Sequence, residues 1–229
     1  ENKPLPPASI AKLLTALIAR EELGRDERIE ISASAKAVGE KQSPAPVGEI
    51  FRRDEAIRLA LIESANDAAA ALAEAVGRRR GGFSPQHRLK IFQVLLAERA
   101  AQIGLESSRF QNPTGIDEKG QSATSRDLAK LLEYLWQNDQ ELLRLTRSVQ
   151  TSARSEQGRE YLLKNTNALL AEFPAIRASK TGTVDEEPGT LALLYPARPD
   201  RIAVIVILKS PDKFGDGRTL LRWLEQTFP

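Results

Sequence analysis

Residues 6–21 read PPASIAKLLTALIARE. Apolar side chains recur in this stretch at i, i+3, i+4, i+7 and i+8, which predicts an amphipathic helix with one face in the core: Ile10, Leu13, Leu14, Leu17 and Ile18. Ser9 and Lys12 stand at the front of this stripe, three residues apart and on neighbouring positions of one face. The pair has two interpretations: a helix-capping serine beside a solvated lysine, or a nucleophile beside its base.

Composition excludes several classes of protein. The chain has 229 residues, 41% of them hydrophobic, enough to bury one core with one or two lobes. A net charge of +2 argues against a dedicated nucleic-acid binder, and the one dense basic run, GRRRGG at 77–82, predicts a solvated loop. Because no apolar run reaches about 18 residues, we expect no transmembrane segment in this chain.

The absence of cysteine excludes thiol catalysis, disulfides and thiolate metal sites. A single histidine, His87, excludes sites with several histidine ligands, and its place at the start of a predicted helix indicates an exposed, non-catalytic residue. The sequence contains neither a phosphate-binding glycine loop nor a calcium loop. If the protein is an enzyme, we expect it to work without cofactor or metal, through Ser, Thr, Lys, Asp or Glu.

Hydrophobic periodicity predicts an α+β domain with a helical insertion. The middle of the chain is helix and loop, and the last third holds KTG as a strand, two more strands and a closing helix. The predicted elements are a strand at 28–32, a loop at 43–51, helices at 52–63, 67–77 (ended by Gly77) and 84–103 (ended by Gly104), a loop at 107–123, a helix capped by Thr124 with Asp127 at the capping-box position, strands at 190–195 and 201–208 around a proline-containing turn, and a helix at 218–228.

The pattern Ser-x-x-Lys is weak by itself, because about 0.7 matches are expected by chance. A second match, SPDK at 210–213, is interpreted as a decoy in a turn with no helix behind it. Ser9 differs because the positive end of a helix dipole would stabilise a negative charge there. Burial would lower the pKa of Lys12 and make it a base. Taken alone, the pair still favours the capping interpretation.

Two further polar groups lie in informative places. Ser64 and Asn66 stand in a break between two helices, where a hydroxyl could relay a proton and an amide could hold a substrate carbonyl; helix capping is the alternative. Lys180-Thr181-Gly182, expected about 0.03 times by chance, precedes the predicted hairpin.

In the Lys-Thr-Gly group, Gly182 would let a substrate backbone approach a strand edge. Lys180, Thr181 and Thr183 would supply donors to an anionic group. The order S-x-x-K, S-x-N, K-T-G, each in a suitable context, is typical of penicillin-binding proteins and serine β-lactamases. Together the three groups favour a nucleophile–base pair at the front of the chain.

Longer blocks extend this likeness. The chain resembles the low-molecular-mass penicillin-binding proteins that are serine-type D-alanyl-D-alanine carboxypeptidases, and the resemblance covers most of its length. The blocks that carry it are PPASIAKLLTA, VGEIFRRDEAIRLALIESANDAAAALAE, FQNPTGIDEKGQSATSRDLAKLL, KNTNALL and SKTGTVDEEPGTLA.

The resemblance implies a role for each matching residue. Ser9 would be the acylated nucleophile and Lys12 its general base. Ser64 would pass the proton to the leaving D-alanine, and Asn66 would orient the acyl side chain. The substrate's terminal carboxylate would be bound by Lys180 and Thr181.

The backbone N–H groups of Ser9 and Thr183, beside Gly182, would form the oxyanion hole. Water would then release a peptidoglycan stem peptide shortened by one D-alanine. β-Lactam antibiotics would trap Ser9 as inhibitors.

The resemblance also implies a β-lactamase/transpeptidase-like fold, an antiparallel sheet flanked by helices plus an all-helical lobe. We expect one catalytic domain over 1–229, with a helical lobe at about 35–150 and a sheet lobe at about 1–34 and 151–229. Only eight residues precede Ser9, so the family's N-terminal strands are expected to be missing and a sheet edge to be unpaired. The implied location is extracytoplasmic, at the bacterial periplasm or wall, with any membrane association through segments absent here.

Three alternatives stay open. A D,D-endopeptidase of the same fold, which cuts peptidoglycan cross-links, would use the same residues. A class A β-lactamase would need a glutamate in a Glu-x-x-Leu-Asn context, and the sequence contains no such block. A non-catalytic wall-binding relative would keep the fold without the chemistry.

Overall fold

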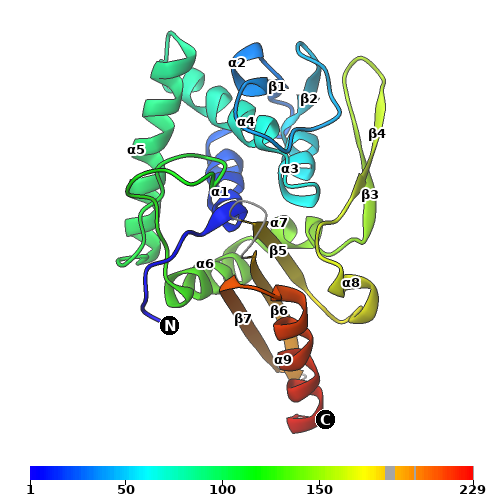
Figure 1. The fold of residues 1–229 in the computed structure, drawn as a ribbon. Helices are drawn as coiled ribbons and strands as arrows, with labels where there is room; N and C mark the ends of the chain where they lie inside the picture. Colours follow the sequence, from blue (N-terminus) through cyan, green and yellow to red (C-terminus); the bar gives the residue numbers. More distant parts are fainter. Residues whose placement is uncertain (184–188, 199, 229) are drawn as a thin grey trace.

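The computed structural model describes residues 1–183, 189–198 and 200–228. Two groups of elements meet at its centre, mainly helices α1–α5 above and the sheet β5–β7 with α9 below (Figure 1). The elements in chain order are η1 (Ala8–Ala11, a 3₁₀ turn), α1 (Lys12–Glu22), β1 (Arg28–Glu30), α2 (Ala33–Lys36), β2 (Ile50–Arg52), α3 (Arg53–Ile62), α4 (Asn66–Arg79), α5 (Pro85–Ile103), α6 (Ser125–Asn138), α7 (Gln140–Leu145), β3 (Gln150–Arg154), β4 (Glu160–Lys164), α8 (Leu169–Glu172), β5 (Ala178–Thr183), β6 (Gly189–Arg198), β7 (Arg201–Ser210) and α9 (Lys213–Thr227).

The main sheet is antiparallel, in the order β5-β6-β7. Alternate residues of β6 point to opposite faces. Ala192 and Leu194 join the large core shared with α1 and α6, whereas Leu191 and Leu193 join a second core under α9. Both faces of this sheet are therefore covered, which explains why its strands read as nearly continuous apolar runs.

The sheet has an open edge, as expected. Within the described ranges, β7 pairs with β6 alone, and the residues before η1 form one isolated bridge, from Leu5 to Ala123, without adding a strand to the sheet. The α+β class and the antiparallel sheet flanked by helices are confirmed. The boundaries between the two lobes stay a prediction.

Gly77 corrects one expected boundary. The α4 helix continues through Gly77 to Arg79, so the prediction that this glycine ends the helix was wrong. A Cβ on Gly77 would collide with the backbone of Arg88 in α5. The glycine thus allows two helices to cross closely, and its conformational freedom is not used to stop the chain. Gly104, with φ 81°, does end α5 as predicted.

Two other predictions were incomplete. Residues 50–51, predicted as loop, belong to β2, which pairs with β1 through three residues on each strand. The last helix begins at Lys213 rather than 218, because the side chain of Asp212 accepts from the N–H of Gly215 and caps it. The SPDK stretch therefore does lead into a helix. By contrast, Thr124 caps α6 by accepting from Asp127 N–H, as predicted.

No helix in the described part of the chain is both long and apolar enough to cross a membrane.

Candidate active site

Ser9 lies on the 3₁₀ turn η1 rather than at a helix cap. Pro7 is the residue before this turn and makes no side-chain capping bond. The Ser9 hydroxyl instead lies 2.8 Å from the Nζ of Lys12, whose side chain is 0% exposed. A capping serine beside a solvated lysine is therefore the wrong interpretation of this pair.

Three oxygens surround the Lys12 amine. Besides Ser9 Oγ, Nζ lies 2.8 Å from Asn66 Oδ1 and 2.7 Å from the Thr114 carbonyl oxygen. The amide and carbonyl oxygens can only accept, so they take two N–H groups. A neutral amine then has its lone pair left for the hydroxyl proton of Ser9. The geometry suits a lysine that accepts a proton from the serine.

Burial lowers the pKa of Lys12 well below its usual 10.5, and the positive charge of Lys41 lowers it further. Asp67 acts in the opposite direction and raises it. Desolvation dominates because a buried ammonium loses its hydration shell. The same burial that removes Lys12 from solvent thus makes it a stronger candidate base at neutral pH.

Ser64 lies in the break between α3 and α4, as predicted, whereas Asn66, predicted in the same break, is the first residue of α4. The backbone N–H of Asn66 donates to the Lys41 carbonyl at 2.9 Å, and its side-chain Nδ2 donates to the Glu40 carbonyl at 2.6 Å. These bonds fix the amide so that its oxygen faces Lys12. The Asn66 oxygen, expected to orient substrate, is thus already engaged with the lysine.

Lys180 reaches Ser64 from the sheet. Its Nζ donates to Ser64 Oγ at 2.8 Å and to the Thr181 carbonyl at 2.8 Å, and the side chain is 1% exposed. Burial lowers the pKa of Lys180 well below 10.5, with further lowering by the charges of Lys12, Lys41 and Lys213. A hydroxyl held by a buried lysine is suited to relay a proton.

Gly182 lets strand β5 touch the serine turn. A Cβ at this position would lie 2.8 Å from the backbone nitrogen of Ser9 and 2.7 Å from Ala8 Cβ, closer than real Cβ atoms come. In Figure 1 the upper end of β5 accordingly lies beside the start of α1. Thr181 Oγ1 lies 2.5 Å from Thr166 Oγ1, and Thr183 is exposed at the strand end.

Backbone strain gathers around the same residues. Ala8 has φ 46°, Ser64 has φ 65° and Lys41 has φ 55°, values that cost free energy for residues with a Cβ. In the described chain Lys209 is the one other non-glycine residue with positive φ. Strain of this kind persists where the surrounding structure holds a functional geometry.

Three contributors to the site were not predicted from the sequence. Thr114, in the NPTG block, supplies a carbonyl to Lys12, and the following Gly115 abuts the Ala8 carbonyl, where a Cβ would clash. Lys41 adds charge. Lys213, interpreted as part of a decoy, lies 3.2 Å from Thr183 Oγ1 and 3.3 Å from the Gly182 carbonyl. The quoted NPTG block was a signal for the first; the others become visible only in space.

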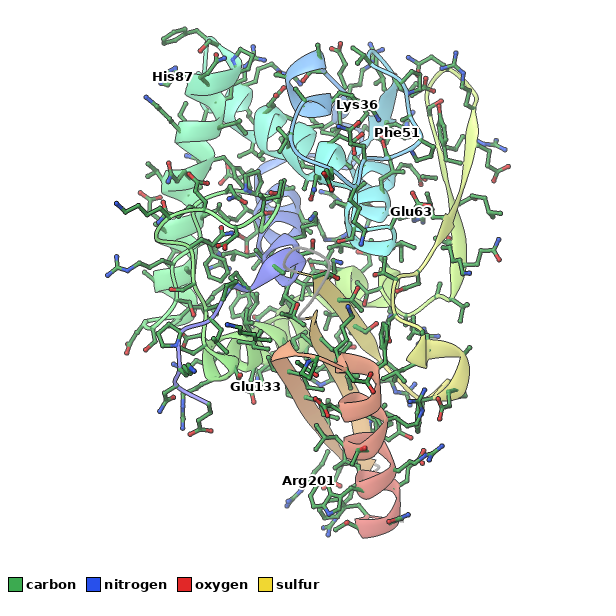
Figure 2. All side chains as sticks on the ribbon, in the orientation of Figure 1. Lys36, Phe51, Glu63, His87, Glu133 and Arg201 are labelled. Carbon is green, nitrogen blue, oxygen red and sulfur yellow. The ribbon has the colours of Figure 1, made fainter. Side chains whose placement is uncertain are left out.

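His87 lies at the outer end of α5, away from these residues (Figure 2). Its backbone N–H donates to the capping Ser84 hydroxyl. In the described residues no group of three or more His, Asp or Glu side chains is arranged to hold a metal ion.

Comparisons with known proteins agree with this geometry. A sequence profile of the Peptidase S11 family, described as D-alanyl-D-alanine carboxypeptidase, matches residues 1–208. The crystal structure of the Streptomyces K15 DD-transpeptidase has the same fold, with a TM-score of 0.85 at 22% identity over 98% of this chain and 89% of that one.

Curated relatives include the D-alanyl-D-alanine carboxypeptidase DacF of Bacillus subtilis, 27% identical over 81% of this chain and 46% of its own length. The D-alanyl-D-alanine endopeptidase of Escherichia coli is 29% identical over 96% of this chain and 69% of its own. This chain thus spans less than half of the first relative and about seven tenths of the second. Because the family profile covers 208 of its 229 residues, the chain belongs to the Peptidase S11 family of D-alanyl-D-alanine carboxypeptidases.

Proposed function

We propose that this protein is a serine D,D-carboxypeptidase that removes the terminal D-alanine from peptidoglycan stem peptides through an acyl-enzyme. The observation that carries the proposal is the buried Lys12 amine, 2.8 Å from Ser9 Oγ and with its pKa well below the usual value. The extracytoplasmic location follows from the substrate, because the peptidoglycan layer lies outside the cytoplasm.

In acylation, Ser9 Oγ attacks the carbonyl carbon of the penultimate D-alanine while its proton passes to the neutral Lys12 amine. Negative charge develops on the carbonyl oxygen. The backbone N–H groups of Ser9 and Thr183 would stabilise it, in a place where the close approach at Gly182 brings strand and serine turn together.

Departure of D-alanine requires a proton on its nitrogen. Ser64 would deliver it, since its hydroxyl accepts from Lys180 and can donate to the leaving amine. The terminal carboxylate would accept hydrogen bonds from the Thr181 hydroxyl and from the Lys180 amine. Water then cleaves the ester, and β-lactams, which resemble the D-alanyl-D-alanine terminus, would hold Ser9 as a slowly hydrolysed adduct.

D,D-endopeptidase activity is the second candidate. Relatives from Escherichia coli and Pseudomonas aeruginosa named D-alanyl-D-alanine endopeptidase match 96% of this chain at 29% identity. Both reactions cleave after the same D-alanine and differ in the group that leaves.

The test is labelling with fluorescent penicillin. We expect wild type to be labelled and Ser9→Ala to be unlabelled, because Ser9 is the proposed nucleophile and the buried Lys12 amine lies beside its hydroxyl to take the proton. Ser210→Ala is the matched control: Ser210 belongs to the other Ser-x-x-Lys stretch, but its hydroxyl donates to Asp216. Labelling that survives in Ser9→Ala, or is missing from folded wild type, contradicts the proposal.

Substrate choice is tested with a pentapeptide and a cross-linked peptide dimer, analysed by mass spectrometry. Loss of one D-alanine from the pentapeptide supports the carboxypeptidase. Cleavage of the dimer alone supports the endopeptidase. Penicillin turnover in milliseconds would instead indicate a β-lactamase.

A further inference from the structure

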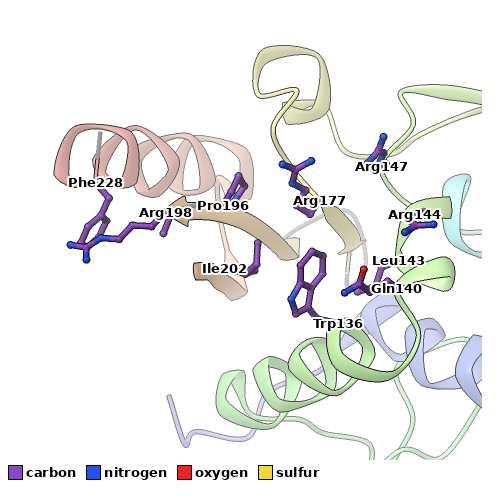
Figure 3. A pocket seen from close by; sticks show the side chains of 11 residues that line it. Trp136, Gln140, Leu143, Arg144, Arg147, Arg177, Pro196, Arg198, Ile202 and Phe228 are labelled. Carbon is purple, nitrogen blue, oxygen red and sulfur yellow. The ribbon is translucent and has the colours of Figure 1, made fainter. Parts of the chain in front are cut away.

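A basin of about 580 Å³ lies at the end of the sheet opposite to Gly182, and Figure 3 shows the side chains that line it. It is bordered by the end of α6, by α7, by the residue before β5 and by the turn ends of β6 and β7. None of the residues assigned to the candidate active site lines it. The basin is therefore a concave surface separate from the candidate active site.

Four arginines border the basin: Arg144, Arg147, Arg177 and Arg198. All four are exposed, and no acidic side chain is among the lining residues. Across the described ranges, none of the four forms an ion pair; Arg198 instead stacks over the Phe228 ring at 5.0 Å.

Two acidic residues on α7 and α8 are engaged with other arginines. Glu141 pairs with Arg20 and Arg25, and Glu172 pairs with Arg218 and Arg222; these pairs are 2.7–3.2 Å long. Among the described residues the four basin arginines have no such carboxylate partner, so their guanidinium donors are available to a ligand.

The floor of the basin is apolar. Trp136 projects between Ile202 and Gln140 in Figure 3, and Ile202 faces Pro196 in register across β6 and β7. An apolar floor with charged groups at its rim suits a ligand that has flat or ring-shaped apolar faces and anionic groups beside them. Guanidinium groups bind planar carboxylates through two parallel hydrogen bonds, which makes a carboxylate a good match.

The distance between the basin and the candidate active site limits what this ligand can be. Lys180 pairs with Ala192, and Arg198 lies six residues further along β6, about 20 Å away at about 3.3 Å per residue. A D-alanyl-D-alanine terminus spans only about 7 Å. The terminus being cleaved therefore cannot reach Arg198 from Ser9, whereas another stem peptide of the same polymer can.

We propose that the arginine basin binds carboxylate groups of the peptidoglycan polymer, on stem peptides other than the one that is bound at Ser9. This inference rests on the proposed function for the identity of the polymer. Binding at a second place would keep the enzyme on its polymeric substrate between cleavage events, since linked contacts raise the effective concentration of the second site.

The experiment measures sedimentation of the protein with isolated, insoluble peptidoglycan at low salt. All proteins carry Ser9→Ala, so that binding is observed without turnover. Arg147→Gln/Arg177→Gln is compared with Lys90→Gln/Arg109→Gln, which removes two exposed charges from α5 and the segment after it. We expect about tenfold weaker binding for the first pair and unchanged binding for the second.

A chemical control removes the ligand group instead of the arginines. Peptidoglycan whose carboxylates have been converted to amides should bind the Ser9→Ala protein about tenfold more weakly, and the arginine variant should lose little further. Thermal unfolding of the arginine variant, expected to match the parent, excludes loss of the fold as the cause.

Three outcomes overturn the proposal: equal binding by the two double variants, undiminished binding to amidated polymer, or arginine-dependent binding to phosphatidylglycerol vesicles with unchanged polymer binding. None of them depends on catalysis. Penicillin labelling of Ser9 in the wild type tests the proposed function separately, so the two can fail independently.

Discussion

Residues 9–12 and 210–213 both read Ser-x-x-Lys, and both come just before or at the start of a helix. In the first stretch the lysine is fully buried and bonded to its own serine. In the second, the Ser210 hydroxyl donates to Asp216 at 2.6 Å and Lys213 reaches toward Thr183. The same spacing thus produces a coupled pair in one place and two unrelated side chains in the other.

Burial accounts for the difference. Lys12 is enclosed by residues from α4 and the NPTG loop, so its ammonium form is disfavoured and its amine is available as a base. Lys213 is only half-buried and lies beside Thr183 at the end of β5, where a lysine serves as a positive charge. Four substitutions test this contrast, from the largest expected effect to the smallest.

Lys12→Met should lower the rate of acylation by benzylpenicillin by about 10³-fold, because the serine loses its proton acceptor. Lys213→Met makes the same chemical change in the other stretch and should lower the rate of acylation by only about tenfold. Time-resolved labelling with fluorescent penicillin measures both. Similar losses in the two variants would show that burial does not separate the two lysines.

Gly182→Ala should slow acylation by about 10²-fold, since the new methyl group would push β5 away from the Ser9 nitrogen and displace the reacting groups. Gly24→Ala is the matched control, because a Cβ there meets nothing within 4 Å. Folding of both variants is checked by circular dichroism. If Gly182→Ala were acylated at the wild-type rate, the close approach of strand β5 and the serine turn would be refuted.

Lys213→Met should raise the KM for a D-alanyl-D-alanine peptide by about tenfold while kcat stays within about twofold. Lys213, 3.2 Å from Thr183 Oγ1, would supply positive charge near the substrate carboxylate proposed at Thr181, and such an attraction contributes to binding more than to the chemical step. Steady-state kinetics decide the matter; a fall in kcat at unchanged KM would argue for a role in proton transfer.

Lys41→Gln should move the rising limb of the pH–rate profile to higher pH. The charge of Lys41 lowers the pKa of Lys12, so its removal raises that pKa and leaves more Lys12 protonated and inactive at neutral pH. The effect is expected to be smaller than those above because burial is the larger cause. Lys90→Gln, an exposed change on α5, should leave the profile in place.

Much of the fold was predictable from local patterns. The Thr124 cap, the Gly104 stop and the antiparallel hairpin of β6 and β7 all follow from residue choice within a few positions. The three groups of site residues were also recognisable, because their spacing and order are unusual.

What escaped prediction depends on contacts between distant segments. Gly77 resembles a helix stop until α5 is seen to cross it. Lys213 resembles a decoy until β5 brings Thr183 beside it. The three-residue strand β2 is too short to show a periodicity, and its pairing with β1 is visible only in space.

The crowding at Ala8 has a consequence for the order in which the chain becomes reactive. Gly115 and Gly182, each more than a hundred residues further along, both close on the turn that holds the serine. During synthesis Ser9 leaves the ribosome well before Gly115 and Gly182 do. If Ser9 is the nucleophile that we propose, a half-made chain carries an ordinary, unreactive hydroxyl there, and covalent labelling by penicillin would report that the last third of the chain has folded.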